Sequence, residues 1–191
     1  MNQPQKVTAN PVDLLQDLER VLISEGELAD RIERLGAEIS RDYAGRDLVL
    51  ISVLKGGIVF LADLMRRITI PHAIELVGAS SYKGGTVALG GVRVTKDVDQ
   101  SIAGKDVLLV EDIYDTGNTL HVIHDLLRLH NPASLEICAL LRKTKPQVQK
   151  LGVRYLGFDI DDVFVVGYGL DFKERYRNLP CIGVLKHALY E

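Results

Sequence analysis

The sequence predicts an α/β fold in which helices flank both faces of a parallel-sheet core. Short aliphatic runs of strand length alternate along the chain with segments whose apolar residues recur every three or four positions, and this alternation is typical of βα units. The 191 residues, 47% of them hydrophobic and 26% charged, have the composition of one globular domain. The formal net charge of −3 argues against nucleic acid or a membrane surface as a partner.

The first elements are predicted by a helix start signal and an aliphatic run. Ser24 and Glu27 have the spacing of a capping box, in which each side chain accepts a hydrogen bond from the backbone of the other residue. An apolar helix face follows, ending near Gly45, at Leu28, Ile32, Leu35 and Ile39. Residues 47–54 (DLVLISVL) predict a buried strand, and a Lys-Gly-Gly turn separates them from a predicted helix at residues 58–67.

The rest of the chain continues the alternation. Further strands are predicted at residues 73–79, 105–110 and 134–141, and a helix at residues 119–130. Residues 80–91 (SSYKGGTVALGG) contain four glycines and no strong periodicity, which predicts a long loop. The segment 151–191 contains short β-like pieces punctuated by glycines. The polar N-terminal segment, the absence of a long apolar run and the presence of only two cysteines predict a cytoplasmic protein.

An acidic pair marks the end of the predicted strand at residues 105–110. Glu111 and Asp112 are costly to ionise in a buried place, and they become useful if they bind hydroxyl groups or a metal ion. The next residues, Asp-Thr-Gly-Asn-Thr at 115–119, offer backbone N–H groups, hydroxyls and a glycine at a helix start. This combination predicts a phosphate-binding loop. The alternative is that Asp115 or Thr116 only caps the helix.

The segment 107–120 (VLLVEDIYDTGNTL) resembles the phosphoribosyl-pyrophosphate signature of the type I phosphoribosyltransferases. The order of the other motifs resembles the bacterial hypoxanthine-guanine phosphoribosyltransferases, with segments 54–57 (LKGG), 81–82 (SY), 141–144 (LRKT) and 164–171 (FVVGYGLD). The resemblance covers most of the chain from about residue 48 to residue 180. It implies a core at about residues 25–145 and a small hood built from both chain ends, residues 1–24 and 146–191.

The resemblance assigns the acidic pair and the loop after it to phosphoribosyl pyrophosphate. It implies that Glu111 and Asp112 bind the ribose 2′- and 3′-hydroxyls, one of them with the help of Mg²⁺, and that Asp115 takes or shares the proton at purine N7. It also implies that the 5′-phosphate is held by Asp115, Thr116, Gly117, Asn118 and Thr119. Many relatives carry a basic residue where this chain has Asn118, so one charge-assisted contact is missing here. We expect this difference to affect substrate affinity rather than the reaction type.

The resemblance also assigns the other motifs. It implies that pyrophosphate is bound by Lys55, Gly56 and Arg177, with an unusual peptide conformation between Leu54 and Lys55, and that Asp171 ligates a second Mg²⁺. It places Ser81 and Tyr82 in a lid over the reacting centre, and it assigns the purine to Lys143, Phe164, Val165 and Asp171. By composition alone, the Lys-Gly-Gly turn could be an ordinary turn, the 80–91 loop an idle surface loop, Lys143 a solvated lysine and Phe164 a core residue.

The function implied by this resemblance is purine salvage. A Mg²⁺-dependent enzyme would transfer the 5-phosphoribosyl group from phosphoribosyl pyrophosphate to N9 of hypoxanthine or guanine, giving IMP or GMP and pyrophosphate. The expected partners are these substrates and further copies of the chain in a homodimer or homotetramer. One alternative is an RNA-binding regulator of the same fold, disfavoured by the lack of a basic surface and by Asp115, where such regulators tend to have tyrosine. Another is an adenine or orotate transferase, which would share the phosphate loop but not Lys143.

Overall fold

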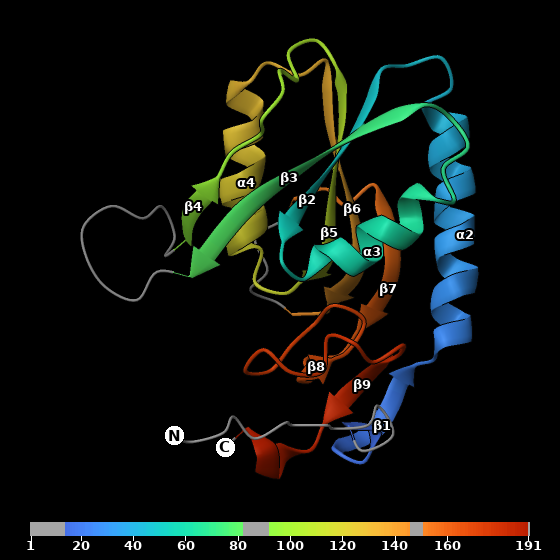
Figure 1. The fold of residues 1–191 in the computed structure, drawn as a ribbon, viewed down its shortest axis with the longest axis vertical. Coiled ribbons are helices and arrows are strands. Elements are labelled where there is room, and N and C mark those ends of the chain that lie inside the picture. Colours follow the sequence, from blue (N-terminus) through green and yellow to red (C-terminus); the bar gives the residue numbers. More distant parts are fainter. Residues whose placement is uncertain (1–13, 82–91, 146–150, 191) are drawn as a thin grey trace, which may run out of the picture.

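Two β-sheets organise the residues that the computed structural model describes, 14–81, 92–145 and 151–190 (Figure 1). The larger sheet has six strands, in the spatial order β4 (Val92–Lys96), β3 (His72–Ser81), β2 (Leu48–Leu54), β5 (Asp106–Tyr114), β6 (Ser134–Lys143) and β7 (Tyr155–Ile160). The smaller sheet has three strands, in the order β1 (Leu18–Ile23), β9 (Ile182–Leu185) and β8 (Val165–Val166).

The larger sheet is parallel except at one edge. Strands β3, β2, β5, β6 and β7 pair in parallel, whereas β4 pairs antiparallel with β3. In Figure 1 the arrowheads of β6 and β7 point toward the smaller sheet. The carboxyl ends of the parallel strands therefore face β8 and β9, which is the edge where ligands bind in open α/β sheets. The predicted fold class, a parallel-sheet core with flanking helices, is confirmed.

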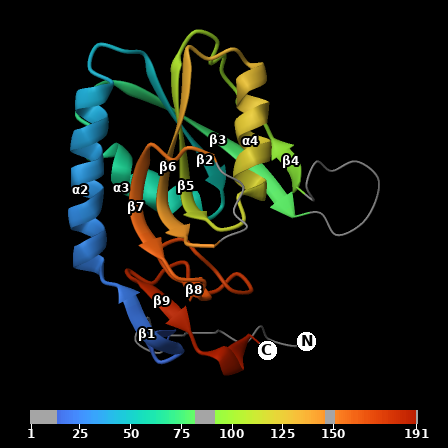
Figure 2. The same cartoon turned by 180° about the vertical axis from the view of Figure 1, so that it is seen from behind.

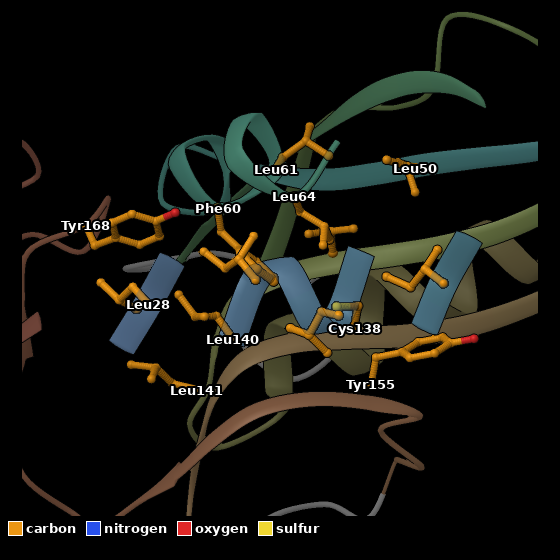
Figure 3. Close-up of a cluster of buried hydrophobic side chains, with 14 of the residues drawn as sticks. Leu28, Leu50, Phe60, Leu61, Leu64, Cys138, Leu140, Leu141, Tyr155 and Tyr168 are labelled. Carbon is orange, nitrogen blue, oxygen red and sulfur yellow. The ribbon is translucent and has the colours of Figure 1, made fainter. Parts of the chain in front are cut away.

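Helices cover both faces of the larger sheet because its strands alternate their apolar side chains between two cores. On one face, Leu48 and Leu50 of β2 pack with residues of α2 (Glu25–Asp42) and α3 (Gly57–Met65), among them Phe60 and Leu64 (Figure 3). On the other face, Val49, Ile51 and Val53 of β2 pack with α4 (Asn118–Leu129). Such two-sided burial explains why the strand sequences read as continuous aliphatic runs.

The long helix α2 begins where the sequence predicts it. Ser24 accepts a hydrogen bond from the Glu27 N–H, and the Glu27 carboxylate accepts one from the Ser24 N–H at 2.8 Å, which completes the capping box. The helix ends at Asp42, three positions before Gly45, and the buried Tyr43 is its C-cap residue. Figure 2 shows α2 running beside β7, where Arg31 donates to the Leu156 and Gly157 carbonyls. Among the described helices, none has the length and apolar character that a membrane span requires.

The smaller sheet draws its strands from both ends of the chain. β1 precedes α2, whereas β8 and β9 follow the larger sheet, and β9 pairs antiparallel with both neighbours. The hood is therefore present, but the expected core limit at residue 145 omits a strand. β7 pairs in parallel with β6 and completes the larger sheet. It is a partly exposed edge strand, so its sequence lacks the dense aliphatic run by which the central strands were predicted.

Other boundaries differ from the sequence prediction in informative ways. β5 continues past Val110 through the acidic pair to Tyr114, because Glu111 and Ile113 still pair with β6. β3 extends to Ser81, so the first two residues of the predicted loop are strand residues paired with the unpredicted β4. The remainder of that loop, residues 82–91, lies outside the described residues.

Removing the Phe60 ring tests the packing of α3 against the sheet. Phe60 is fully buried in the core shown in Figure 3, and truncation of such a ring leaves a cavity. Phe60→Ala is expected to lower the free energy of unfolding by about 3–5 kcal/mol in urea titrations. Ile58→Ala is the control, because Ile58 lies on the exposed side of the same helix, and a change within about 0.5 kcal/mol is expected there. Equal effects of the two substitutions would contradict this packing.

Candidate active site

A cavity of about 350 Å³ lies between the carboxyl ends of the parallel strands and the hood. Most of the residues that line it belong to the predicted motifs, and the complete lining is Lys55, Gly56, Asp112, Ile113, Asp115, Lys143, Phe164, Val165, Leu170, Asp171 and Arg177. A larger cavity of about 720 Å³ opens between α2, α3 and residues 177–180, and it shares only Arg177 with the first. Since the larger cavity gathers none of the other predicted site residues, the smaller one is the candidate active site.

The acidic pair near the end of β5 is buried, and the pKa of each carboxyl group is raised. Glu111 and Asp112 are 8% and 7% exposed. Burial, together with the neighbouring Asp112 charge, raises the pKa of Glu111 well above its ordinary value. Burial raises the pKa of Asp112 to about 6, although the Ile113 N–H, 2.9 Å from its Oδ1, acts in the opposite direction. Two carboxylates kept in such a place indicate a binding role rather than a structural one.

The turn after β2 brings its backbone against this pair. The peptide bond between Leu54 and Lys55 is cis, which confirms the unusual conformation implied by the family resemblance. A Cβ atom on Gly56 would lie 1.9 Å from Asp112 Oδ2, so only glycine fits here. Lys55 Nζ lies 3.1 Å from a Glu174 carboxylate oxygen of the hood. The turn therefore links the acidic pair to residues that follow β8.

The predicted phosphate-binding loop opens helix α4. Gly117 is the N-cap residue, with φ of 84°, a left-handed conformation that favours glycine. The Asn118 N–H donates to Thr116 Oγ1 at 3.4 Å, and the helix continues from Asn118 through Thr119. The N-cap position belongs to Gly117, which has no side chain, so neither Asp115 nor Thr116 is the N-cap residue of this helix. Backbone N–H groups at a helix start of this kind can receive a phosphate group.

Asp115, the first residue of the loop, belongs to a cluster of four charged side chains. Its two carboxylate oxygens face Lys145 Nζ at 2.7 Å and Lys143 Nζ at 3.5 Å. Both lysines also pair with Asp162, Lys145 at 2.7 Å and Lys143 at 3.2 Å. Lys143 is buried within the cluster, so the alternative of a solvated lysine is wrong. The hydrogen bonds to Asp115 and Asp162 raise the pKa of Lys145.

The hood supplies the opposite wall of the cavity. Phe164 stacks on Tyr190 with ring centroids 4.7 Å apart, and Val165 follows it in β8. Arg177 donates to the Gly169 carbonyl at 2.7 Å and pairs with Asp171 at 2.7 Å. These contacts present one aromatic ring, one carboxylate and one guanidinium group to the end of β5.

The cavity brings together nine of the predicted site residues from five separate parts of the chain: Lys55, Gly56, Asp112, Asp115, Lys143, Phe164, Val165, Asp171 and Arg177. Glu111 and residues 116–119 adjoin it along the chain. Of the two predicted lid residues, Ser81 ends β3 and Tyr82 lies outside the described residues. Sequence reasoning missed Lys145, Asp162 and Glu174 as partners of site residues. The two-residue spacing of Lys143 and Lys145 was a usable signal, because such residues share one side of an extended chain.

The acidic pair has the donor chemistry that magnesium requires. Glu111 Oε2 is buried and has no hydrogen-bond partner, and carboxylate oxygens are the ligands that Mg²⁺ prefers. Within the described residues, no group of three or more His, Cys, Asp or Glu side chains could hold a metal ion. Mg²⁺ is commonly bound by one or two carboxylates together with substrate phosphates. The residues present therefore fit an ion that binds with its substrate.

Comparison with known proteins agrees with the motifs in this cavity. A family model described as a phosphoribosyl transferase domain matches residues 23–173. A hypoxanthine-guanine phosphoribosyltransferase of Streptococcus pneumoniae is 44% identical over 177 residues, which cover 93% of this chain and 98% of that protein. The chain belongs to the hypoxanthine-guanine phosphoribosyltransferase family. It is a phosphoribosyltransferase enzyme.

Other members of the family share the sequence and the fold. The hypoxanthine-guanine phosphoribosyltransferase of Bacillus subtilis is 44% identical over 175 residues, covering 92% of this chain and 97% of that protein. A crystal structure of a Staphylococcus aureus hypoxanthine phosphoribosyltransferase superposes with a TM-score of 0.88 at 44% identity, covering 93% of this chain and 97% of that chain. The described fold is therefore the fold of the family.

The raised pKa of Asp112 makes a prediction about stability in the absence of ligands. Its folded-state pKa of about 6 lies above the ordinary value of 3.8, so between these pH values the folded protein retains a proton that the unfolded chain has lost. Stability therefore falls as pH rises through this window, and the deficit persists above it. Asp112→Asn, which removes the ionisation, is expected to raise the urea midpoint relative to wild type at pH 8 but not at pH 4. A lower midpoint than wild type at pH 8 would contradict this burial cost.

Proposed function

We propose that this enzyme transfers the 5-phosphoribosyl group from phosphoribosyl pyrophosphate to N9 of hypoxanthine or guanine, with Mg²⁺ as cofactor. The observation that carries the proposal is the meeting of Asp115 and Lys143 in one cavity, 3.5 Å apart. Asp115 begins the phosphate-binding loop, whereas Lys143 ends a different strand of the sheet. In the proposed roles these groups serve neighbouring atoms on one edge of the purine, N7 for Asp115 and the 6-oxo oxygen for Lys143, so the two side chains must lie close together.

The sugar end of the site is assigned to the acidic pair and the loop. We infer that Glu111 and Asp112 accept hydrogen bonds from the ribose hydroxyls, which is consistent with their burial and with the partnerless Glu111 oxygen. The N–H groups at the start of α4 would bind the 5′-phosphate beside Thr116 and Thr119. Both contacts hold the ribose still while positive charge develops at C1′.

Pyrophosphate would leave on the side of the Lys-Gly-Gly turn. Lys55 and Arg177 are cations at this wall, and both are held by Glu174 in the absence of substrate. When the bond from C1′ to the pyrophosphate oxygen breaks, its electron pair leaves with pyrophosphate, and these cations stabilise the added charge. Bound Mg²⁺, held by Glu111, Asp112 or Asp171, would supply further neutralisation of pyrophosphate charge.

The base end is assigned to Lys143, Asp115 and the hood. Lys143 would donate to the purine 6-oxo group, and Asp115 would take or share the proton at N7 while N9 bonds to C1′. Phe164 lines the cavity and offers a ring for the purine, and Val165 offers its backbone. In the ligand-free structure Lys143 forms ion pairs with Asp115 and Asp162. To donate to the base, Lys143 must give up part of these contacts.

Two further assignments belong to the same proposal. Both cysteines, Cys138 and Cys181, are free and buried, which supports the expected cytoplasmic location, since thiols persist in reducing compartments. The enzyme is also proposed to act as a homodimer or homotetramer. Exposed apolar side chains such as Ile74 and Leu129 provide surface for such contacts.

The base specificity tests the proposed function directly. The wild-type enzyme is expected to release pyrophosphate with hypoxanthine or guanine but to use adenine poorly, because the Lys143 ammonium group has donors only and cannot serve a 6-amino group. Such mismatches can cost on the order of 10⁴-fold in kcat/KM. Lys143→Met should lower kcat/KM for hypoxanthine and guanine and leave the poor adenine value nearly unchanged. Efficient use of adenine by the wild type would overturn the purine-site assignment.

Asp115→Asn tests the assignment of the proton. The substitution keeps the shape of the side chain but removes its basicity, and a positioned acid–base group is worth about 10²–10⁴-fold in kcat. We expect a loss of kcat within this range while phosphoribosyl pyrophosphate still binds, as measured by single-turnover kinetics and calorimetry. Asp159→Asn, at a carboxylate paired with Arg142 outside the cavity, is the control. A near-native kcat of Asp115→Asn would show that the proton assignment is wrong.

A further inference from the structure

The phosphate-binding loop carries no cation of its own. Residues 115–119 provide one carboxylate, hydroxyl groups, an amide and a glycine. A phosphate monoester carries a charge of about −1.5 to −2 at neutral pH, whereas the start of a helix supplies only about half a positive charge. The loop therefore leaves part of the phosphate charge without a partner, and Asp115 adds a further negative charge at its first position.

The structure places the ammonium group of Lys145, a residue outside this loop, beside its first residue. Lys145 Nζ lies 2.7 Å from Asp115 Oδ1 and 2.7 Å from Asp162 Oδ1. The backbone that carries Lys145 is fixed beside the site, because the Thr144 N–H donates to the Ile160 carbonyl of β7 at 3.0 Å. A lysine ammonium group at the end of a four-carbon chain can reorient around such an anchor.

The cations that line the cavity, Lys55, Lys143 and Arg177, are assigned to other parts of the substrates. Lys143 is more deeply buried than Lys145, with 9% of its side chain exposed against 24%, and it serves the base in the proposed function. Lys55 belongs to the turn after β2 and pairs with Glu174, and Arg177 belongs to the hood and pairs with Asp171. Within the described parts of the chain, Asp115 forms ion pairs with Lys143 and Lys145.

We propose that Lys145 binds the 5′-phosphate of phosphoribosyl pyrophosphate and of the product nucleotide, supplying the cation that the loop lacks. This inference rests on the proposed function and deepens it. In the ligand-free enzyme, Asp115 and Asp162 hold Lys145 at the edge of the loop. When the phosphate enters, Lys145 turns from Asp115 to the phosphate, and Asp115 becomes free to face the base.

Lys145→Met tests this assignment by separating phosphate affinity from base affinity. We expect the Kd for GMP, measured by calorimetry, and the KM for phosphoribosyl pyrophosphate to rise about tenfold, the worth of a hydrogen bond to a charged group. The KM for guanine and kcat should stay within about twofold, since Lys145 does not touch the base. Lys105→Met is the matched control, because Lys105 is an ion-paired lysine of similar exposure that precedes β5, at the opposite end of that strand.

Rescue distinguishes a phosphate contact from a merely structural role. Adding Asn118→Lys to the Lys145→Met variant puts a cation into the loop and is expected to restore the GMP affinity. An unchanged GMP affinity of Lys145→Met would overturn this inference alone, as would an equal loss for GMP and guanine or a failure of rescue. Wild-type protein that binds no GMP would overturn the proposed function and this inference together.

Discussion

The burial of two adjacent carboxylates at the end of β5 is the constraint on which the rest of the site depends. β5 lies between β2 and β6, so Glu111 and Asp112 are placed in the middle of the sheet edge. Burial disfavours the charged form of each carboxyl group and so raises the pKa of both. The turn after β2 must then approach without a side chain, because Asp112 fills the space that a Cβ atom of Gly56 would need. Binding chemistry and local backbone shape are therefore set by the same pair.

The cations of the ligand-free site are all balanced by acidic side chains. Lys143 and Lys145 pair with Asp115 and Asp162, whereas Arg177 pairs with Asp171. A substrate with a phosphate and a pyrophosphate group offers stronger partners to these cations than the carboxylates do. Binding can then proceed as an exchange of ion-pair partners, which limits the desolvation that charged groups undergo in a closed site.

Much of the fold could be predicted because it is encoded locally. The capping box at Ser24, the apolar face of α2 and the two-sided burial of β2 each leave a pattern within about ten residues. The strands β1, β4 and β7 lie at sheet edges with mixed burial, so they lack the dense aliphatic runs that mark the central strands. Edge strands are fixed by pairing with distant partners, and no local period records that pairing.

The sequence by itself identified the family and the candidate site, because the predicted phosphate-binding loop, the acidic pair and Lys143 at the end of β6 lie in short motifs that resemble those of the family. Tertiary structure alone decided which charges face one another. Asp162 is 17 positions from Lys145, and Glu174 is separated from Lys55 by 119. These pairs form because the folded chain places the hood, which is drawn from both chain ends, next to the strand ends. Coulomb interactions depend on the distance between two charges in space, and not on their separation along the chain.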